Sequence, residues 1–294
     1  TKELTLLFSD VRGFTAIAED FKDDPAALTR LMNEFLTILS NAIMDNGGTI
    51  DKFMGDAVMA FWNAPGQNKD HIRLACRTAL RMTRDIKAFN SRRAATERLA
   101  RMKARKREIS SADSDLTPTK IHRINVGIGI NTGPCVVGNM GSEGRFDYTA
   151  LGDPVNVASR LEGQSRYYGA QVILGSATAR VVADELAVLE LDTVRVVGKE
   201  LPEQIFALVG DSELRQKPEF QSAIEQNREM LQAYRTQDWT KAETQLELVE
   251  ATYRDLRLKL DDYVALYRQR ISDLRATPPA ANWDGVFSFT KKSS

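Results

Sequence analysis

The chain has 294 residues, of which 43% are hydrophobic, so it can bury a sizeable core in one large domain with an appendage. Its 40 basic and 40 acidic side chains cancel, so no overall field attracts nucleic acid, which is not expected as a partner. The two cysteines, Cys76 and Cys135, show no disulfide or zinc-site pattern, so we expect reduced packing residues. The apolar runs are far shorter than the roughly 20 residues that cross a bilayer.

Two aspartates each end a short apolar run that is typical of a β-strand. Asp10 follows Leu6-Leu7-Phe8-Ser9, and Asp56 follows Phe53-Met54-Gly55. A carboxylate among strand-forming residues is costly unless something pairs with it. Two such carboxylates can hold hard divalent cations through oxygen, as phosphoryl chemistry on a nucleotide requires. We therefore expect Asp10 and Asp56 to bind metal as a pair; either one alone has the properties of an ordinary turn residue.

The chain from residue 24 to residue 89 predicts two helices and a hairpin. Asp24-Pro25 caps a helix whose apolar residues recur at helical spacing up to Gly47-Gly48. A hairpin fits residues 49–61, with Gly55-Asp56 at its turn, and a second helix fits about 71–89. We interpret His71, at the start of the second helix, as a capping or surface residue and not as a ligand.

A basic segment follows the second helix. Residues 92–108 are rich in Arg and Lys, and a Ser- and Asp-rich stretch, 110–115, comes next. We interpret them as a solvated helical protrusion and loop, with a docking or lipid-headgroup patch as the alternative.

The segment from residue 124 to residue 209 predicts the rest of a sheet. Strands fit 124–130 and the stretch that begins at Pro134, with a turn at 131–133 between them. A helix begins at Pro154, and on it Asn156 and Arg160 are four residues apart, so an amide and a guanidinium suited to a sugar and a phosphate share one face. The remaining elements of this α/β or α+β architecture are a strand over 171–174, a helix over 176–185 and a strand pair over 188–197 and 204–209.

The composition changes after Gly210. Amphipathic helices fit 220–234, 239–253 and 263–274, and the stretch 233–242 resembles the turn of a tetratricopeptide hairpin. One such repeat cannot close a core alone, so these helices should pack on the preceding part or on a second chain. The final stretch, 277–294, either docks back as an extended strand or stays free.

These motifs, taken together, carry a resemblance to a known family. The order Phe8-Ser9-Asp10, Lys52 with Gly55-Asp56, Thr149, Asn156 and Arg160 resembles class III nucleotidyl cyclases over roughly residues 1–210, in particular the bacterial receptor-type adenylate cyclases. The resemblance implies an α+β fold, the ferredoxin-like palm with a mostly antiparallel central sheet flanked by helices. It also implies a catalytic domain over 1–210, a tetratricopeptide-like helical extension over 211–276 and a C-terminal tail over 277–294.

Each candidate site residue has an expected role, and the resemblance implies most of these roles. Two Mg²⁺ or Mn²⁺ ions per site would be held by Asp10, Asp56 and the Val11 carbonyl. The amides of Gly13, Phe14 and Thr15 precede a helix and suit the β- and γ-phosphates, and Lys199 and Arg145 are also expected to bind phosphate. Asn156 is expected to contact the ribose and Arg160 the α-phosphate. Lys52 and Thr149 are expected to contact the purine.

The purine pair favours ATP. A lysine can donate to adenine N1 and a threonine hydroxyl can accept from the N6 amine, whereas guanine presents a donor and a carbonyl there. Guanylate-type relatives carry glutamate and a small polar residue or cysteine at these positions, and this chain has Lys52 and Thr149. The function expected is adenylate cyclase, a lyase of signal transduction. The alternatives are a guanylate cyclase, a catalytically silent nucleotide-binding module, a scaffold centred on 213–276 and, for Lys52, a surface lysine.

The resemblance also implies how chains assemble and where they work. The metal aspartates would act from one protomer and Lys52, Thr149, Asn156 and Arg160 from the other, giving a symmetric homodimer with two shared sites. A cytoplasmic location is implied, as at the cytoplasmic end of a membrane-anchored receptor. Because the sequence starts at Thr1 and a strand follows at once, we expect a fragment of a longer polypeptide with a membrane or sensor segment upstream.

Overall fold

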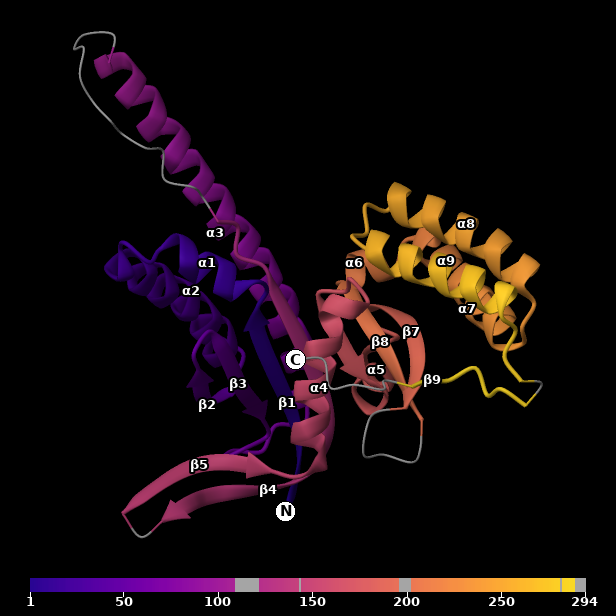
Figure 1. Ribbon diagram of the computed structural model, residues 1–294. Coiled ribbons are helices and arrows are strands. Elements are labelled where there is room, and N and C mark those ends of the chain that lie inside the picture. Colours follow the sequence, from indigo (N-terminus) through magenta and orange to yellow (C-terminus); the bar gives the residue numbers. More distant parts are fainter. Residues whose placement is uncertain (109–121, 143, 196–201, 281, 289–294) are drawn as a thin grey trace.

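A computed structural model describes residues 1–108, 122–142, 144–195, 202–280 and 282–288 (Figure 1). The strands are β1 (Lys2–Val11), β2 (Thr49–Met54), β3 (Ala57–Trp62), β4 (Val126–Ser142), β5 (Arg145–Leu151), β6 (Val172–Gly175), β7 (Ala187–Arg195), β8 (Glu203–Gly210) and β9 (Phe287–Ser288). The helices are α1 (Phe14–Asp20), α2 (Pro25–Asp45), α3 (His71–Glu108), α4 (Asp153–Tyr167), α5 (Ser176–Val182), α6 (Ser212–Arg215), α7 (Pro218–Arg235), α8 (Trp239–Asp255) and α9 (Asp261–Ala276).

The strands form one mostly antiparallel sheet. Its order is β2-β3-β1-β4-β6-β8-β7-β9, and β5 pairs with the far half of β4. Within the described chain, only the β4–β6 and β7–β9 pairs are parallel. Helices flank this sheet, so the expected α+β architecture is confirmed. Figure 1 shows the β4–β5 hairpin and the distal part of α3 projecting from opposite ends of the molecule.

Alternation along β1 assigns its side chains to two cores. Leu7 and Val11 belong to the core formed with α2 and α3, whereas Leu4 and Leu6 belong to the core that includes Ala158 of α4. Successive side chains on a strand point to opposite faces, so Asp10 shares the α4 face with Leu4 and Leu6. The register of β1 therefore directs Asp10 toward α4.

Two glycines let α4 lie directly against β4. A Cβ at Gly129 would lie 2.2 Å from the Glu162 nitrogen and 2.3 Å from the Ala158 oxygen. A Cβ at Gly127 would lie 2.1 Å from the Ser165 hydroxyl oxygen. Only glycine permits such a close approach of two backbones, so these positions fix the height of α4 above the sheet.

The turn predicted at 131–133 is wrong. β4 runs without interruption from Val126 to Ser142, because Asn131, Thr132 and Gly133 continue the pairing with β1. The local turn preference of these residues is outweighed by their hydrogen-bonded pairing with the neighbouring strand.

The start of α3 also differs from the sequence interpretation. His71 is buried, with its Nδ1 2.7 Å from the Thr5 hydroxyl, so it is an internal hydrogen-bonding residue and neither a cap nor a surface residue. Residues 92–108 continue α3, so the helical part of the predicted protrusion is confirmed. The stretch 110–115 lies outside the described residues.

The C-terminal helices pack on the sheet. Their apolar side chains, among them Phe220, Leu246 and Tyr267, share one core with Leu189 and Leu191 of β7. Beyond α9, Phe287 pairs with Val194 at the edge of the sheet, so residues 287–288 of the tail dock as a short strand. Among the residues that the structure describes, no helix is both long and apolar enough to cross a membrane.

Candidate active site

The aspartate pair lies where β1 ends beside the turn between β2 and β3. Gly55, in the left-handed conformation with φ 66°, makes the tight turn that presents Asp56. Burial, the Asp56 charge and a hydrogen bond between the two carboxyl groups raise the pKa of Asp10 from 3.8 to about 6. The structure thus brings the two carboxylates together, and their mutual repulsion favours a cation between them.

Glu162 is a third acidic residue at this place, and the sequence analysis missed it. Burial, followed by the charge of Asp10, raises its pKa from 4.5 to about 7, with Asp56 also raising it and Arg12 opposing. The sequence does show an acidic residue at this position, on the face of the predicted helix opposite Arg160. Nothing in the sequence indicates which strand that face contacts, so the residue could not be assigned to the site.

The donor set fits a metal that also takes substrate oxygens. Within the described residues, no group of three His, Cys, Asp or Glu side chains forms a complete metal cage. Mg²⁺ is usually bound by one or two carboxylates together with phosphate oxygens and water, which is what a two-aspartate site provides. The backbone of Val11 adjoins the pair, and its N–H donates to Asp10 Oδ1 at 3.0 Å.

Arg12 fastens this end of β1 to its surroundings. Its backbone N–H donates to the Asn125 oxygen at 2.8 Å, and its guanidinium donates to the oxygens of Ser165 at 3.0 Å and Ala170 at 2.9 Å. These three bonds connect the residue two places after Asp10 to the start of β4 and the end of α4. Arg12 is therefore a positioning residue of the site.

Gly13, Phe14 and Thr15 form the start of α1. Gly13 has φ 71° in the left-handed region, and no side chain caps the helix. The first N–H groups of a helix have no partners within the helix, so they remain available to an anion beside the aspartate pair.

Lys52 and Thr149 are brought together by Asp51, a residue that the sequence analysis did not single out. The Thr149 hydroxyl donates to Asp51 Oδ2, and Lys52 Nζ lies 3.3 Å from Asp51 Oδ1. The Asp51 side chain is 1% exposed and that of Lys52 is 44% exposed. A shift of register between Ile50 and Lys52 in the pairing with β3 places Asp51 in a bulge, which re-aims its side chain.

Asn156 and Arg160 lie on the outer side of α4. Glu162 faces β4, and a residue two positions away points to the opposite side of a helix, so Arg160 faces away from the aspartate pair. Asn156 is exposed and Arg160 is half-buried, and neither bonds to another side chain within the part of the chain that is described. One chain therefore does not bring these two residues to Asp10 and Asp56.

Two expected phosphate ligands cannot be placed. Lys199 lies in 196–201, outside the described residues. Arg145 begins β5 opposite Ser142, and its side chain lies outside the described part.

Comparison with known proteins identifies the family. Residues 1–210 match the adenylate and guanylate cyclase catalytic domain. The chain therefore belongs to the family of class III nucleotide cyclase catalytic domains. Its relatives include adenylate cyclase 1 of Rhizobium meliloti, 34% identical over 71% of this chain, and an adenylate cyclase of Anabaena cylindrica, 34% identical over 68%. The chain spans only 28% and 35% of the lengths of these two relatives.

Solved structures agree with this assignment. The adenylyl cyclase CyaB from P. aeruginosa is 31% identical with a TM-score of 0.58, covering 71% of this chain and 95% of that one. The guanylyl cyclase Cya2 is 30% identical with a TM-score of 0.58, covering 72% of this chain and 94% of that one. Because both nucleotide specificities occur on an equally similar fold, the fold alone does not decide the substrate.

Proposed function

We propose that this chain is the catalytic part of an adenylate cyclase, which converts ATP to 3′,5′-cyclic AMP and pyrophosphate. The observation that carries the proposal is the adjacency of Asp10 and Asp56, with the pKa of Asp10 raised to about 6. Two carboxylates that repel each other at the end of a strand destabilise the fold, but they can bind the divalent cations that such a reaction uses.

Two Mg²⁺ or Mn²⁺ ions would be held by Asp10, Asp56 and the backbone oxygen of Val11. Catalytic domains of this family depend on metal ions. When bound, such ions lower the pKa of the ribose 3′-hydroxyl and neutralise the triphosphate. The amides of Gly13, Phe14 and Thr15 would bind the β- and γ-phosphates, together with Lys199 and Arg145.

Asp51 gives the purine pair its orientation in this proposal. Because the Thr149 hydroxyl donates its hydrogen to Asp51, its oxygen is left to accept from the N6 amine of adenine. Lys52, held beside the same carboxylate, would donate to N1. Guanine would place its O6 carbonyl against an acceptor, so the arrangement supports ATP over GTP.

A symmetric homodimer would complete the site. Asn156 and Arg160 point away from their own aspartate pair, so the ribose and α-phosphate contacts would come from the partner subunit. The projecting hairpin offers apolar surface for such contact, since Val136 is 53% exposed, Phe146 63% and Leu151 56%. In the shared site Arg160 would neutralise charge that develops on the α-phosphate, and Asn156 would orient the ribose.

The division of the chain is part of the proposal. The catalytic domain would end near residue 210, where the family match ends, and α7 to α9 would form a tetratricopeptide-like extension over 211–276 before the tail over 277–294. Because the chain covers about a third of its relatives' length, we also propose that a sensor or membrane segment belongs to the complete protein, with this part in the cytoplasm.

Product identification tests the proposal. The chain is incubated with ATP or GTP and with Mg²⁺ or Mn²⁺ at several protein concentrations, and the products are separated and quantified. Cyclic AMP from ATP, with specific activity rising with concentration, is expected. Cyclic GMP from GTP as the main product would favour a guanylate cyclase, and ATP binding without product would favour a silent module.

A further inference from the structure

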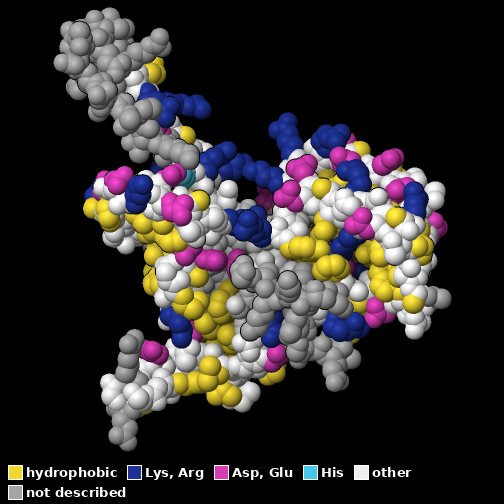
Figure 2. Space-filling model, viewed as in Figure 1, with side chains coloured by type: hydrophobic (Ala, Val, Ile, Leu, Met, Phe, Trp, Pro, Cys, Tyr) yellow, Lys and Arg dark blue, Asp and Glu magenta, His cyan; other side chains and the backbone are white. Residues whose placement is uncertain are grey.

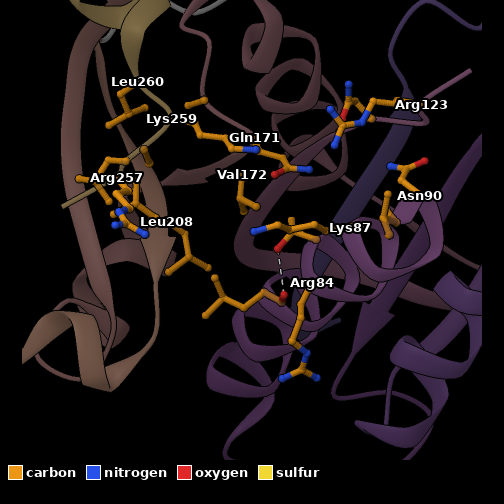
Figure 3. A pocket seen from close by; sticks show the side chains of 18 residues that line it. Arg84, Lys87, Asn90, Arg123, Gln171, Val172, Leu208, Arg257, Lys259 and Leu260 are labelled. Atoms are coloured by element: carbon orange, nitrogen blue, oxygen red, sulfur yellow. Dashed lines mark hydrogen bonds between the residues drawn. The ribbon is translucent and has the colours of Figure 1, made fainter. Parts of the chain in front are cut away.

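A cavity of about 530 Å³ lies between α3, strands β6 and β8, and the segment 257–260 that joins α8 to α9 (Figure 3). Its walls include Val172 and Leu208, which belong to the core on the α3 side of the sheet. Asp10 faces α4 on the other side, so this cavity is separate from the proposed cyclase site. Its volume is within the range of sites that bind small molecules.

The cavity is lined by cations and, among the described residues, by no carboxylate. Lys87 comes from α3, Arg123 precedes β4, and Arg257 and Lys259 come from the segment after α8. None of these four side chains has an ion pair or hydrogen bond with another described residue. These four exposed cations, from three separate segments of the chain, create a positive potential that attracts an anion.

Arg84 provides a contrast within the same wall. It contacts Asp85, with its Nε 3.4 Å from Oδ1, and in Figure 3 its guanidinium points away from the other labelled cations, whereas Lys87 extends into the space between α3 and the 257–260 segment. In the face shown in Figure 2, Lys and Arg side chains gather between α3 and the C-terminal helices.

The walls also have an apolar part. Val172, Leu208 and Leu260 line the cavity beside the Gln171 amide. The Asn90 side chain is already occupied, since it bonds to the backbone oxygen and nitrogen of Ile124 at 2.7 and 3.0 Å. The cavity therefore combines a cationic rim with apolar surface, which suits a ligand that has an anionic group and an organic body.

Arg257 has a backbone conformation that is unusual for its residue type. Arg257 has φ 56°, in the left-handed region, at the position after the end of α8 where glycine is favoured. This conformation is less favourable for an arginine than for a glycine.

We propose that this cavity binds a small organic phosphate, with the phosphate among Lys87, Arg123, Arg257 and Lys259 and the organic body against Val172 and Leu208. The site adjoins the catalytic strand through Arg12. Asn125 and Ala170 both line the cavity, and both accept hydrogen bonds from Arg12, two residues after Asp10. An occupant would thus contact residues that hold the end of β1.

Calorimetric titration of the full chain with phenyl phosphate, in the presence of a metal chelator, tests the proposal without depending on cyclase activity. Phenyl phosphate should bind more tightly than inorganic phosphate, because it also contacts the apolar wall, and benzyl alcohol should not bind. The double variant Lys87→Gln/Lys259→Gln should weaken phenyl phosphate binding at least tenfold, while Arg84→Gln, the matched control on the same helix, should leave it unchanged.

A further variant separates this cavity from the cyclase site. Arg160→Ala should leave phenyl phosphate affinity unchanged, and circular dichroism should show that every variant is folded. The proposal is overturned if the wild-type chain does not bind phenyl phosphate, if the double variant binds as the wild type does, or if Arg160→Ala or Arg84→Gln loses as much affinity as the double variant.

Discussion

Two acidic sites in this chain, one buried and one half-buried, have opposite electrostatic arrangements. Asp192 on β7 is fully buried, and its Oδ2 accepts from the Tyr168 hydroxyl and from Arg270 Nη1, both at 2.7 Å. Its Oδ1 accepts from the Thr193 backbone at 2.8 Å. Asp10, in contrast, has one backbone donor and a second carboxylate as its neighbour.

In the proposed function, this difference separates a structural site from a reactive one. The Asp192 site is complete within the chain, and it ties α9 to β7 and to the end of α4 through Arg270, whose guanidinium also lies 3.9 Å from the centroid of the Phe287 ring. Under the same proposal the Asp10 site is incomplete within one chain, because its two carboxylates repel each other and Arg160 faces away from them. Such local conflicts are expected at functional sites.

Removing one carboxylate of the reactive site should have the largest effect. We expect Asp10→Asn to lower the cyclase rate by about a thousandfold or more, equivalent to about 4 kcal/mol, because a metal position is lost. The measurement is cyclic AMP formation under saturating Mn²⁺, with Asp85→Asn on α3 as a matched acidic control. Retention of more than a tenth of the activity by Asp10→Asn would show that the pair is not reactive.

Breaking the structural site should affect stability. We expect Arg270→Met to lower the free energy of unfolding by about 3–5 kcal/mol, because Asp192 would stay buried without its counter-charge. Denaturant unfolding of this variant and of the double variant Arg270→Met/Asp192→Leu measures the loss of stability. The double variant should be more stable than the single one; equal losses would mean that the packing of Arg270, and not its charge, matters.

A smaller effect is expected at the purine pair. Asp51→Ala should reduce the preference for ATP over GTP about tenfold, because the Thr149 hydroxyl would no longer be held as an acceptor. Asp51→Asn, which can still accept from Thr149, should retain most of the preference. Competition between ATP and GTP in one assay gives the ratio of the two cyclisation rates. An unchanged ratio in Asp51→Ala would show that Asp51 does not contribute to the preference for ATP.

The smallest effect concerns pH. The folded state binds a proton at Asp10 with a pKa of about 6, while the unfolded chain binds it near 3.8, so metal-free protein should gain stability as the pH falls from 7 toward 4. Asp56→Asn removes one cause of the raised pKa and should show a smaller gain. Thermal unfolding of the wild type and of Asp56→Asn, in chelator at several pH values, measures the two gains in stability. Identical pH profiles would argue against repulsion between Asp10 and Asp56.

The comparison also shows what the sequence could predict. Local patterns were sufficient for the helix after Asp24, for the hairpin that presents Asp56 and for the C-terminal helices, because each depends on neighbouring residues. The family resemblance then indicated how the separate motifs work together. The turn predicted at 131–133 failed because pairing with β1 outweighed local turn preference.

The residues that were missed act through partners far along the chain. Thr149 meets Asp51 across 98 positions, and Arg270 meets Asp192 across 78. Periodicity places such a residue on a face but does not say which face it will meet, so Asp51, Glu162 and Arg12 could be assigned only from the fold. Each of them nevertheless adjoins or lies near a residue that the sequence did indicate.

The most direct test of the central claim is complementation between two inactive chains. Asp10→Ala chains and Arg160→Ala chains are mixed in equal amounts, and cyclic AMP formation is measured. Random pairing leaves half of the dimers mixed, each with one intact site of two, so about a quarter of wild-type activity is expected. If the mixture is as inactive as each parent while the chains are shown to exchange, the shared site is contradicted.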